Sequence, residues 1–376
     1  MKKRSSFLGI AILVAALALT VSLAACGEQE TTTTAASQPP STQTTQAPTT
    51  ATTQAPSTET TAGKAKVLRL AAPWPLGDPV TDNIQEFVDK FNAQAGGKYV
   101  IELHPGGSLL AMQDEFEAVK TGGVEMAGWP IAVFASVVPI FNLAELPFAV
   151  NSIEADAAYN AAMSPLYDQA LAQFGIKNVF NFTCQGGDVI SVKPVRTLED
   201  WKGLLCQTIS PVTAKIVELL GGSGVAIDWS EGYQALSKKV VEATVQSGSM
   251  VIQFKLNEVA KYVTRAYLYP AAIGIYMNKK VYEEMPPDIQ QLVDKLGKEA
   301  QESTNANMVK LYHSNYDKMA ELGMEIYPLP KAERDRWGEK LKPFAEELLG
   351  KVDKATADQV RQTTQQLDQQ FPYTEK

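Results

Sequence analysis

The sequence predicts an α/β protein with two parallel-sheet units in a chain of 376 residues. Apolar strands alternate with amphipathic helices between residues 67 and 127, and the same alternation recurs from residue 203 onward. A single helical pattern then runs from Pro286 to about Leu322. Strands joined by crossover helices form parallel sheets, and such sheets place ligands at the carboxyl ends of their strands. A chain of this length can hold two domains.

The amino terminus, residues 1–25, has the pattern of a targeting segment rather than of a folded element. Basic residues at positions 2–4 precede an apolar run from Phe7 to Val21, which is short for a membrane-spanning helix. Leu23 to Cys26 resemble a bacterial lipobox, whose cysteine becomes the lipid-modified first residue of the mature protein. We therefore expect lipidation of Cys26 and an extracytoplasmic protein anchored to the cell membrane, on its periplasmic side or outer surface. The alternative is an ordinary signal peptide with a chance cysteine.

Residues 26–64 are expected to comprise the lipidated cysteine and a disordered tether. From Glu28 to Lys64 the chain is rich in Thr, Gln, Ala, Pro and Ser and has almost no large apolar side chain. Such a segment buries too little apolar surface to fold. As a flexible coil it would span roughly 35 Å.

The folded body opens with a β-α-β-α-β pattern. Apolar residues at positions 84, 87, 88 and 91 share one face of a helix that Thr81-Asp82 can cap. The expected elements are a strand at 67–72, that helix, a strand at 99–103, a helix after residue 109 and a strand at 124–127.

The middle of the chain leads into the second unit. An apolar stretch at 131–150 precedes a helix at 152–174, a strand at 178–183 and an expected hinge at Gly186-Gly187. A connecting strand and a turn at 196–202 then lead to a strand at 203–209, a helix from Ser210-Pro211, a strand at 225–227 and a helix from about Ser230. After a strand at 262–277 and the long helix, a strand at 324–327 and two helices end the chain.

Charge and residue counts exclude several classes of function. The net charge is −8 and no basic patch stands out, which argues against a nucleic-acid partner. His104 and His313 are the only histidines, so a histidine-based metal site or a Ser-His-Asp hydrolase is not indicated. We expect no catalytic residue, no cofactor and no metal. Cys184 and Cys206 either form a disulfide outside the cytoplasm or stay as two thiols, and the sequence leaves both readings open.

Five segments, in order, are similar to motifs of one family, the solute-binding proteins of tripartite ATP-independent (TRAP) transporters of the DctP type. They are HPGGSL at 104–109 with TGGVEM at 121–126, ELPF at 145–148, KP and EDWKGL within 193–204, EGYQAL at 231–236, and MNKK with MPPDIQ within 277–290. The resemblance covers nearly the whole body from Val67. It implies a two-lobed, type II-like periplasmic-binding-protein fold with connecting hinge strands and a long spanning helix. Lobe I would comprise residues 65–188 and 274–318, and lobe II residues 189–273 and 319–376.

The chain departs from the family pattern at the residues that would hold a substrate carboxylate. The strand after the Gly-Leu motif usually ends in an arginine, whose planar fork suits a carboxylate; here that position is Gln207. A second family arginine falls near Gly186–Asp188, where this chain has none, and the family's asparagine aligns with Gln246. We therefore predict a ligand that is not held by the usual arginine clamp. The alternative is a structural Gln207 with another Lys or Arg in the arginine's place.

Seven residues form the predicted ligand site. Trp74 and Trp129 follow predicted strands and could form an aromatic wall. Gln207 and Ser210 lie at the end of a predicted strand of lobe II, and Asp188 and Gln246 align with family positions. Tyr233, on the following helix, completes the set, although packing is the simpler role for it. For Asp78, beside Trp74, a cap or loop role is the simpler interpretation.

The function that this resemblance implies is that of an extracytoplasmic receptor. It would capture a small organic solute between two lobes by hinge closure and present it to the membrane subunits of a TRAP transporter. The alternatives are a ligand-binding sensor for a membrane signalling receptor and the receptor of an ATP-driven importer. An extracellular α/β enzyme is disfavoured because no nucleophile elbow or phosphate-binding loop occurs.

Overall fold

Two β-sheets organise the protein in the computed structural model, which describes residues 65–375. The first sheet contains β1 (Lys66–Ala71), β2 (Tyr99–His104), β3 (Met126–Pro130), β4 (Ile176–Thr183) and β10 (Ala272–Asn278), in the order β2-β1-β3-β10-β4. The second sheet contains β5 (Asp188–Ser191), β6 (Leu205–Thr208), β7 (Ser223–Ala226), β8 (Ala243–Gln246), β9 (Tyr262–Arg265) and β11 (Glu325–Pro328), in the order β11-β9-β5-β8-β6-β7.

The first sheet is built from the predicted β-α-β-α-β unit. β1 runs parallel to β2 and β3, and α1 (Pro79–Gln94) and α2 (Met112–Thr121) form the crossovers. β10, which comes much later in the sequence, runs antiparallel between β3 and β4 and is buried along its whole length. The first half of the body is therefore closed by a strand that returns from the second half.

Two boundaries in this unit differ from the sequence prediction. In each case the backbone amides at the boundary make hydrogen bonds that cap the end of a helix. Asp78, not Thr81 or Asp82, caps α1: its carboxylate accepts a hydrogen bond from the Val80 amide at 2.7 Å, and Pro79 begins the helix. β3 begins at Met126 rather than Val124. The amides of Gly123 and Val124 donate to Ala118 O and so complete the C-terminal turn of α2.

The second sheet combines parallel and antiparallel strands. β6 pairs in parallel with β7 and β8, whereas β5 runs antiparallel to β8 and β9. α4 (Pro211–Leu220) and α5 (Gly232–Ser237) connect these strands, together with α6 (Gly248–Gln253) after β8. The described chain also contains five short 3-10 helices: η1 (Ile131–Phe134), η2 (Pro139–Glu145), η3 (Leu198–Trp201), η4 (Trp229–Glu231) and η5 (Leu256–Glu258).

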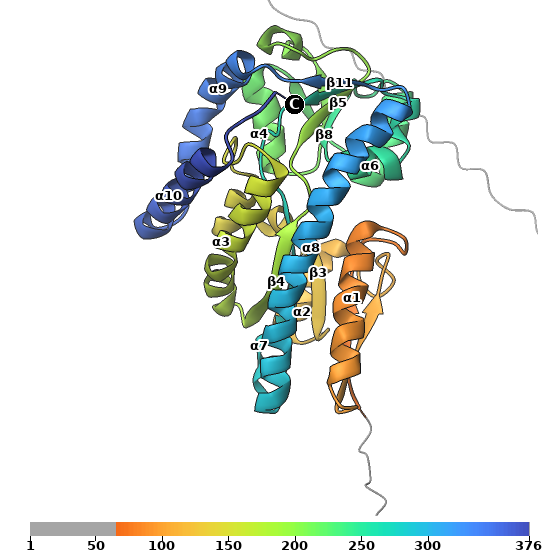
Figure 1. The fold of residues 1–376 in the computed structure, drawn as a ribbon, viewed down its shortest axis with the longest axis vertical. Helices are drawn as coiled ribbons and strands as arrows, with labels where there is room; N and C mark the ends of the chain where they lie inside the picture. The colour runs from red at the N-terminus through yellow and green to blue at the C-terminus, as the bar shows by residue number, and fades with distance from the viewer. Residues whose placement is uncertain (1–64, 376) are drawn as a thin grey trace, which may run out of the picture. The chain divides into compact units, whose positions relative to one another are not determined.

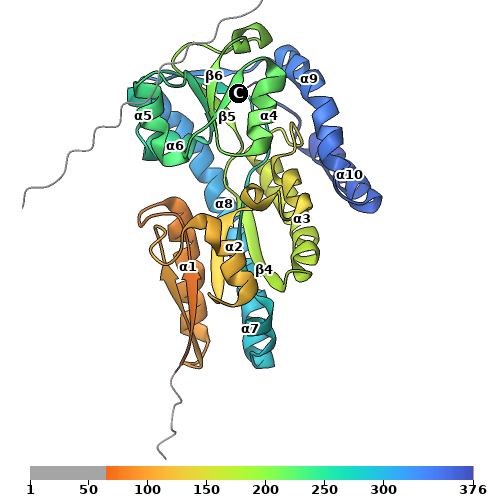
Figure 2. The ribbon, with the colours of Figure 1, turned by 180° about the vertical axis from the view of Figure 1, so that it is seen from behind.

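One long helix links the two sheets. After the short α7 (Lys279–Glu283), α8 (Pro287–Glu321) has 35 residues and therefore extends over about 50 Å. It packs against α1 and β4 of the first half and against α6 and β11 of the second. Figures 1 and 2 show it passing from one half to the other. The predicted spanning helix and the two-lobed α/β architecture are thereby confirmed.

The remaining helices also contact both halves. α3 (Ile153–Ala172) packs on β4, and α10 (Lys354–Gln370) packs on α3, whereas α9 (Lys331–Leu349) packs on α4 of the second half. Figure 1 shows α10 below α9 along this edge of the molecule. Among residues 65–375, no helix combines the length and the apolar character that crossing a membrane would require.

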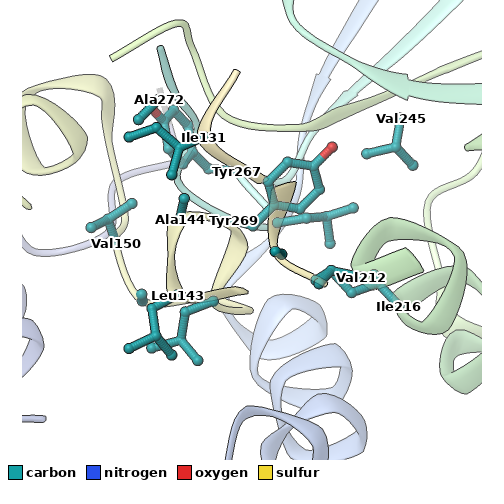
Figure 3. Packing of buried hydrophobic residues seen from close by; sticks show 14 of the residues in the cluster. Ile131, Leu143, Ala144, Val150, Val212, Ile216, Val245, Tyr267, Tyr269 and Ala272 are labelled. Atoms are coloured by element: carbon teal, nitrogen blue, oxygen red, sulfur yellow. The ribbon is translucent and has the colours of Figure 1, made fainter. Parts of the chain in front are cut away.

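Two non-helical connections also pass between the sheets. Residues 184–187 join β4 to β5. Residues 266–271, which we call the linker, join β9 to β10. The sequence predicted one strand from 262 to 277; the structure has two strands in different sheets, separated where Tyr267 adopts a φ of 47°. Figure 3 shows Tyr267 and Tyr269 of the linker packed with apolar residues from other segments, among them Ile131 and Ala144.

Gly186 and Gly187 allow the two connections to approach each other closely. A Cβ at Gly186 would lie 2.2 Å from Tyr269 O, and one at Gly187 would lie 2.5 Å from the Tyr269 ring. Glycine is required here by contact with the linker and not by a positive φ. Two buried carboxylates fix the linker itself: Asp188 accepts from the amides of Ala266 and Tyr267, at 2.9 and 3.0 Å. Asp156 accepts from the Tyr267 hydroxyl at 2.8 Å.

Candidate functional site

A cavity lies between the two sheets, where the parallel strands end. Its empty volume is about 860 Å³. In the first half its lining includes Trp74, which follows β1, and Cys184, which follows β4. In the second half it includes Ile209 after β6 and Gln246 at the end of β8. The carboxyl ends of strands from both sheets therefore border one space, which is the expected location of a ligand in a fold of this kind.

The walls of the cavity are mainly apolar and aromatic. Trp74 lines it from the first half, Trp229 from the second and Tyr269 from the linker. Met250 of α6 and Met308 of α8 add two flexible thioether side chains. Such a surface can hold the apolar or ring-shaped body of a small organic molecule.

Two carboxylates line the cavity. Asp78 is 5% exposed and Glu145 is 6% exposed. Glu145 Oε2 accepts a hydrogen bond from Ser210 Oγ at 2.5 Å, across 65 residues of sequence. Burial raises the pKa of Glu145 to about 7, against the smaller lowering effect of the Ser210 bond, and burial also raises the pKa of Asp78.

Amide side chains supply the polar contacts of the lining. Gln185 adopts a φ of 73°, and its Oε1 accepts from the Ser249 amide and from Asn315 Nδ2, both at 3.4 Å. Its buried Nε2 has no hydrogen-bond partner among the described residues. Gln246 and Gln253 complete the set, and Gln253 donates to the Asp78 carboxylate. Gln185 therefore presents an unused donor at the cavity.

Among the described residues, the cavity lining contains no lysine, arginine or histidine. Arg265, which follows Thr264 at the end of β9, lines a separate cavity with Tyr267 and Tyr312. There its guanidinium lies over the Tyr316 ring, 4.3 Å from the centroid. The described part of the chain also contains no group of three or more Asp, Glu, Cys or His side chains that could hold a metal ion.

Of the seven residues predicted to bind a ligand, the structure brings Trp74 and Gln246 together in the cavity lining. Trp129 is fully buried within β3, and its ring stacks on Tyr276 at 4.0 Å between centroids. It thus faces the first half's core, while Trp74, three residues beyond the end of the neighbouring β1, faces the cavity.

Gln207 and Ser210 flank the cavity without being among its lining residues. Gln207 Nε2 donates to Ile227 O at 3.3 Å and to Asp228 O at 2.8 Å, which are the two residues before Trp229. Ser210 caps α4 and donates to Glu145. Each therefore contacts the segment of a lining residue, Trp229 or Glu145.

Asp188 and Tyr233 are not among the lining residues, although Asp188 follows Gly187 and pairs with Gln246, which both line the cavity. Asp188 is buried and accepts from the linker amides and from the Tyr316 hydroxyl. Tyr233 donates to Glu258 at 3.0 Å at the surface. A contact with the ligand stays a prediction for all seven residues.

Most lining residues were not predicted from the sequence, among them Glu145, Trp229 and Gln185. Glu145 has a signal that could have identified it: it is the one charged residue in the apolar stretch 131–150. Trp229 lies in a polar segment and Gln185 carries no pattern of its own, so neither residue stands out in the sequence. Cys184 and Cys206, whose pairing was left open, are both free thiols.

A two-sheet α/β fold with a long linking helix and a cavity at the strand ends defines the class of the protein: it is a periplasmic-type solute-binding protein. The chain belongs to the DctP family, bacterial extracellular solute-binding protein family 7, whose model matches residues 70–351. It is thus an extracytoplasmic solute receptor of the TRAP type. The family consists of solute-binding proteins and not of enzymes, which confirms the class that the sequence motifs implied.

Individual relatives are distant. A solute-binding protein of Albidiferax ferrireducens is 26% identical over 223 residues, which are 57% of this chain and 65% of that protein. The C4-dicarboxylate-binding periplasmic protein DctP of Rhodobacter capsulatus is 24% identical over 286 residues, 74% of this chain and 84% of that protein. DctP7 of Bordetella pertussis, an extracytoplasmic solute receptor that binds pyroglutamic acid, has a similar fold, with a TM-score of 0.75 at 22% identity over 80% of this chain and all of that one.

Proposed function

We propose that this chain captures a small organic solute in the cavity between its two sheets and presents it to the membrane subunits of a TRAP transporter. The observation that carries the proposal is the cavity of about 860 Å³ that is lined from both sheets and from the linker. Closing the two halves around a solute, about residues 184–187 and the linker, would complete the site. The lobe boundaries at 188/189, 273/274 and 318/319 stay part of this proposal.

We further propose that the solute is not held by an arginine clamp. Two proteins that are similar to this chain bind acidic ligands, one a C4-dicarboxylate and the other pyroglutamic acid. The motif resemblance implies that Gln207 takes the family's arginine position, and no basic residue is among the described lining residues. A carboxylate buried there would have no cation to offset its desolvation. Trp74 and Gln246 are the proposed ligand contacts among the residues indicated by the sequence.

A thermal-shift screen tests both statements. The purified protein is heated with two panels of compounds: small carboxylic acids, and uncharged or cationic metabolites of similar size. A ligand at 100 times its Kd stabilises the native state by about 2.7 kcal/mol, which is a measurable rise in Tm. We expect hits only in the second panel. Hits confined to the carboxylic acids would show that a cationic side chain holds the solute after all. No hit in either panel would argue against solute capture.

We also propose that the receptor is a lipoprotein, with the signal peptide at residues 1–25 and the lipid on Cys26. These residues and the tether at 26–64 lie outside the described part of the chain, so support comes from the lipobox-like sequence alone. Cells fed a labelled fatty acid should incorporate the label into the wild-type protein and not into a Cys26→Ala variant. The matched control is Cys184→Ala, which should keep the label. Equal labelling of the Cys26 variant would contradict lipidation at this site.

A further inference from the structure

The charge of the cavity distinguishes between classes of solute. Asp78 and Glu145 line it, both more than nine-tenths buried, and the described lining holds no cation to pair with them. Carboxylates in a low-dielectric space attract a cation strongly and oppose an anion. The cavity is therefore electrostatically suited to a positively charged guest.

Two helix N-termini beside the cavity, which would otherwise attract an anion, are already occupied by carboxylates. The N-terminus of α1 is capped by Asp78, which accepts from the Val80 amide at 2.7 Å. The N-terminus of α4 is capped by Ser210, whose hydroxyl donates to Glu145. Helix N-termini favour negative charge, so these two ends stabilise the two acids and are not available to an acidic solute.

Capping explains only part of this arrangement. Asp78 would be a sufficient cap without any ligand, but Glu145 belongs to η2 and caps no helix of its own. It is brought to the cavity by the packing of an apolar segment in which it is the one charged residue. Burying a carboxylate beside one uncharged hydrogen-bond donor lowers the stability of the fold, which points to a role for Glu145 in binding.

The aromatic side chains of the lining suit the same class of solute. Trp74, Trp229 and Tyr269 come from three different segments and all border the cavity. Faces of tryptophan and tyrosine attract organic ammonium groups through their quadrupoles, and tryptophan does so most strongly. Gln185 adds a buried Nε2 that has no hydrogen-bond partner in the described part of the chain, and which calls for an acceptor on the solute.

Resting on the proposed solute-binding function, we infer that the solute is a small organic cation. Its ammonium group is held by Asp78 and Glu145, its apolar body lies among Trp74, Trp229 and Tyr269, and a hydroxyl or carbonyl oxygen accepts from Gln185.

Calorimetric titration with matched pairs of compounds tests this inference. Choline and tyramine serve as cations with an acceptor oxygen, and 3,3-dimethylbutan-1-ol and 4-ethylphenol are their uncharged counterparts. Pyroglutamate and malonate serve as anions. We expect at least one cation to bind at least tenfold more tightly than its uncharged counterpart, and no binding of the anions. Tighter binding of the uncharged compounds or of the anions overturns the inference and leaves solute capture intact, whereas no binding at all counts against both.

Substitutions and the pH dependence of binding identify the carboxylate that holds the cation. Glu145→Gln should weaken the bound cation at least tenfold and change its uncharged counterpart less than twofold, whereas Asp114→Asn, an exposed acid outside the lining, should change neither. The wild type provides a second test that requires no variant. Because the pKa of Glu145 is raised to about 7 by burial, cation affinity should rise up to about tenfold between pH 6 and 8 as this group ionises.

The neighbours of Glu145 do not supply the same pH dependence. Ser210 does not titrate, and burial raises the pKa of Cys184 and of Tyr269 above their usual values, so both stay neutral between pH 6 and 8. Asp78 is the other acid of the lining, and Asp78→Asn separates its contribution. Affinity that falls as pH rises would instead show that protonated Glu145 donates to an uncharged solute, and would overturn the inference.

Discussion

Replacing Glu115 by glutamine is expected to stabilise the protein by an amount that grows as the pH rises from 5 to 9. Glu115 is fully buried in α2, and neither carboxylate oxygen has a hydrogen-bond partner among the described residues. Burial therefore raises its pKa to about 9, from 4.5 for an exposed glutamate. The folded state holds this proton over a range of pH in which the unfolded chain releases it.

The sign of the effect follows from proton linkage. Stability from the protonated side chain is fully present below the unfolded pKa and is lost as the pH rises through the folded pKa. Each pH unit within that window costs about 1.4 kcal/mol, so the wild type should lose on the order of 4 kcal/mol by pH 8 that Glu115→Gln does not lose.

Urea denaturation at pH 5, 6, 7, 8 and 9 measures the difference. A constant offset between the two proteins reports the burial of the amide itself, and the slope with pH reports the carboxyl group. Glu117→Gln is the matched control on the same helix: Glu117 pairs with Lys120 at the surface, so its pH profile should run parallel to that of the wild type. A parallel profile for Glu115→Gln as well would show that Glu115 finds a partner in solution.

Asp156→Ala should have the opposite effect and destabilise the protein by about 3 kcal/mol at pH 6. Asp156 is fully buried in α3 and accepts from Thr183 Oγ1 at 2.9 Å, the Tyr267 hydroxyl at 2.8 Å and the Ala271 amide at 3.2 Å. Asn160 Nδ2 donates to its other oxygen at 2.6 Å. Alanine leaves these donors buried without an acceptor, and each such donor costs about 1–3 kcal/mol unless the structure relaxes.

The measurement is again urea denaturation, at one pH. Asp89→Ala is the control, because Asp89 is exposed in the middle of α1 and accepts from Gln85 alone at the surface; its effect should stay within about 0.5 kcal/mol. If Asp156→Ala were no more destabilising than the control, the linker would not depend on this carboxylate. Since three of the four donors lie outside α3, the result also tests whether Asp156 holds the linker against the first half.

These two acids show why burial alone does not decide the role of a residue. Burial raises the pKa of both Glu115 and Asp156, in the second case to about 7. The difference is in their hydrogen-bond partners, since the described structure provides four donors to Asp156 and none to Glu115. Partners that come from β4 and from the linker, more than 25 residues away along the chain, leave no local signal in the sequence.

The local sequence pattern determined the type of most elements. Periodicity indicated α1, and the Ser210-Pro211 pair marked the start of α4, because helix faces and caps depend on residues within a turn of one another. The two-lobed arrangement followed from the order of five short motifs and not from periodicity. Where the pattern was wrong, as for the single strand expected at 262–277, the break came from the packing of the linker against Gly186 and Gly187.

The site depended on tertiary structure to a greater degree. Trp74 and Trp129 look alike in sequence, each following apolar residues and beside a proline, but one lines the cavity and the other stacks on Tyr276 in the core. Gln207 stands where the family motif predicts a ligand contact, and its amide instead holds the carbonyls before Trp229. The sequence indicated the family and the type of most elements, and it predicts that the usual arginine is absent from the site. Only the packing of distant segments decided which side chains share the cavity, because burial and proximity depend on contacts between residues far apart in the chain.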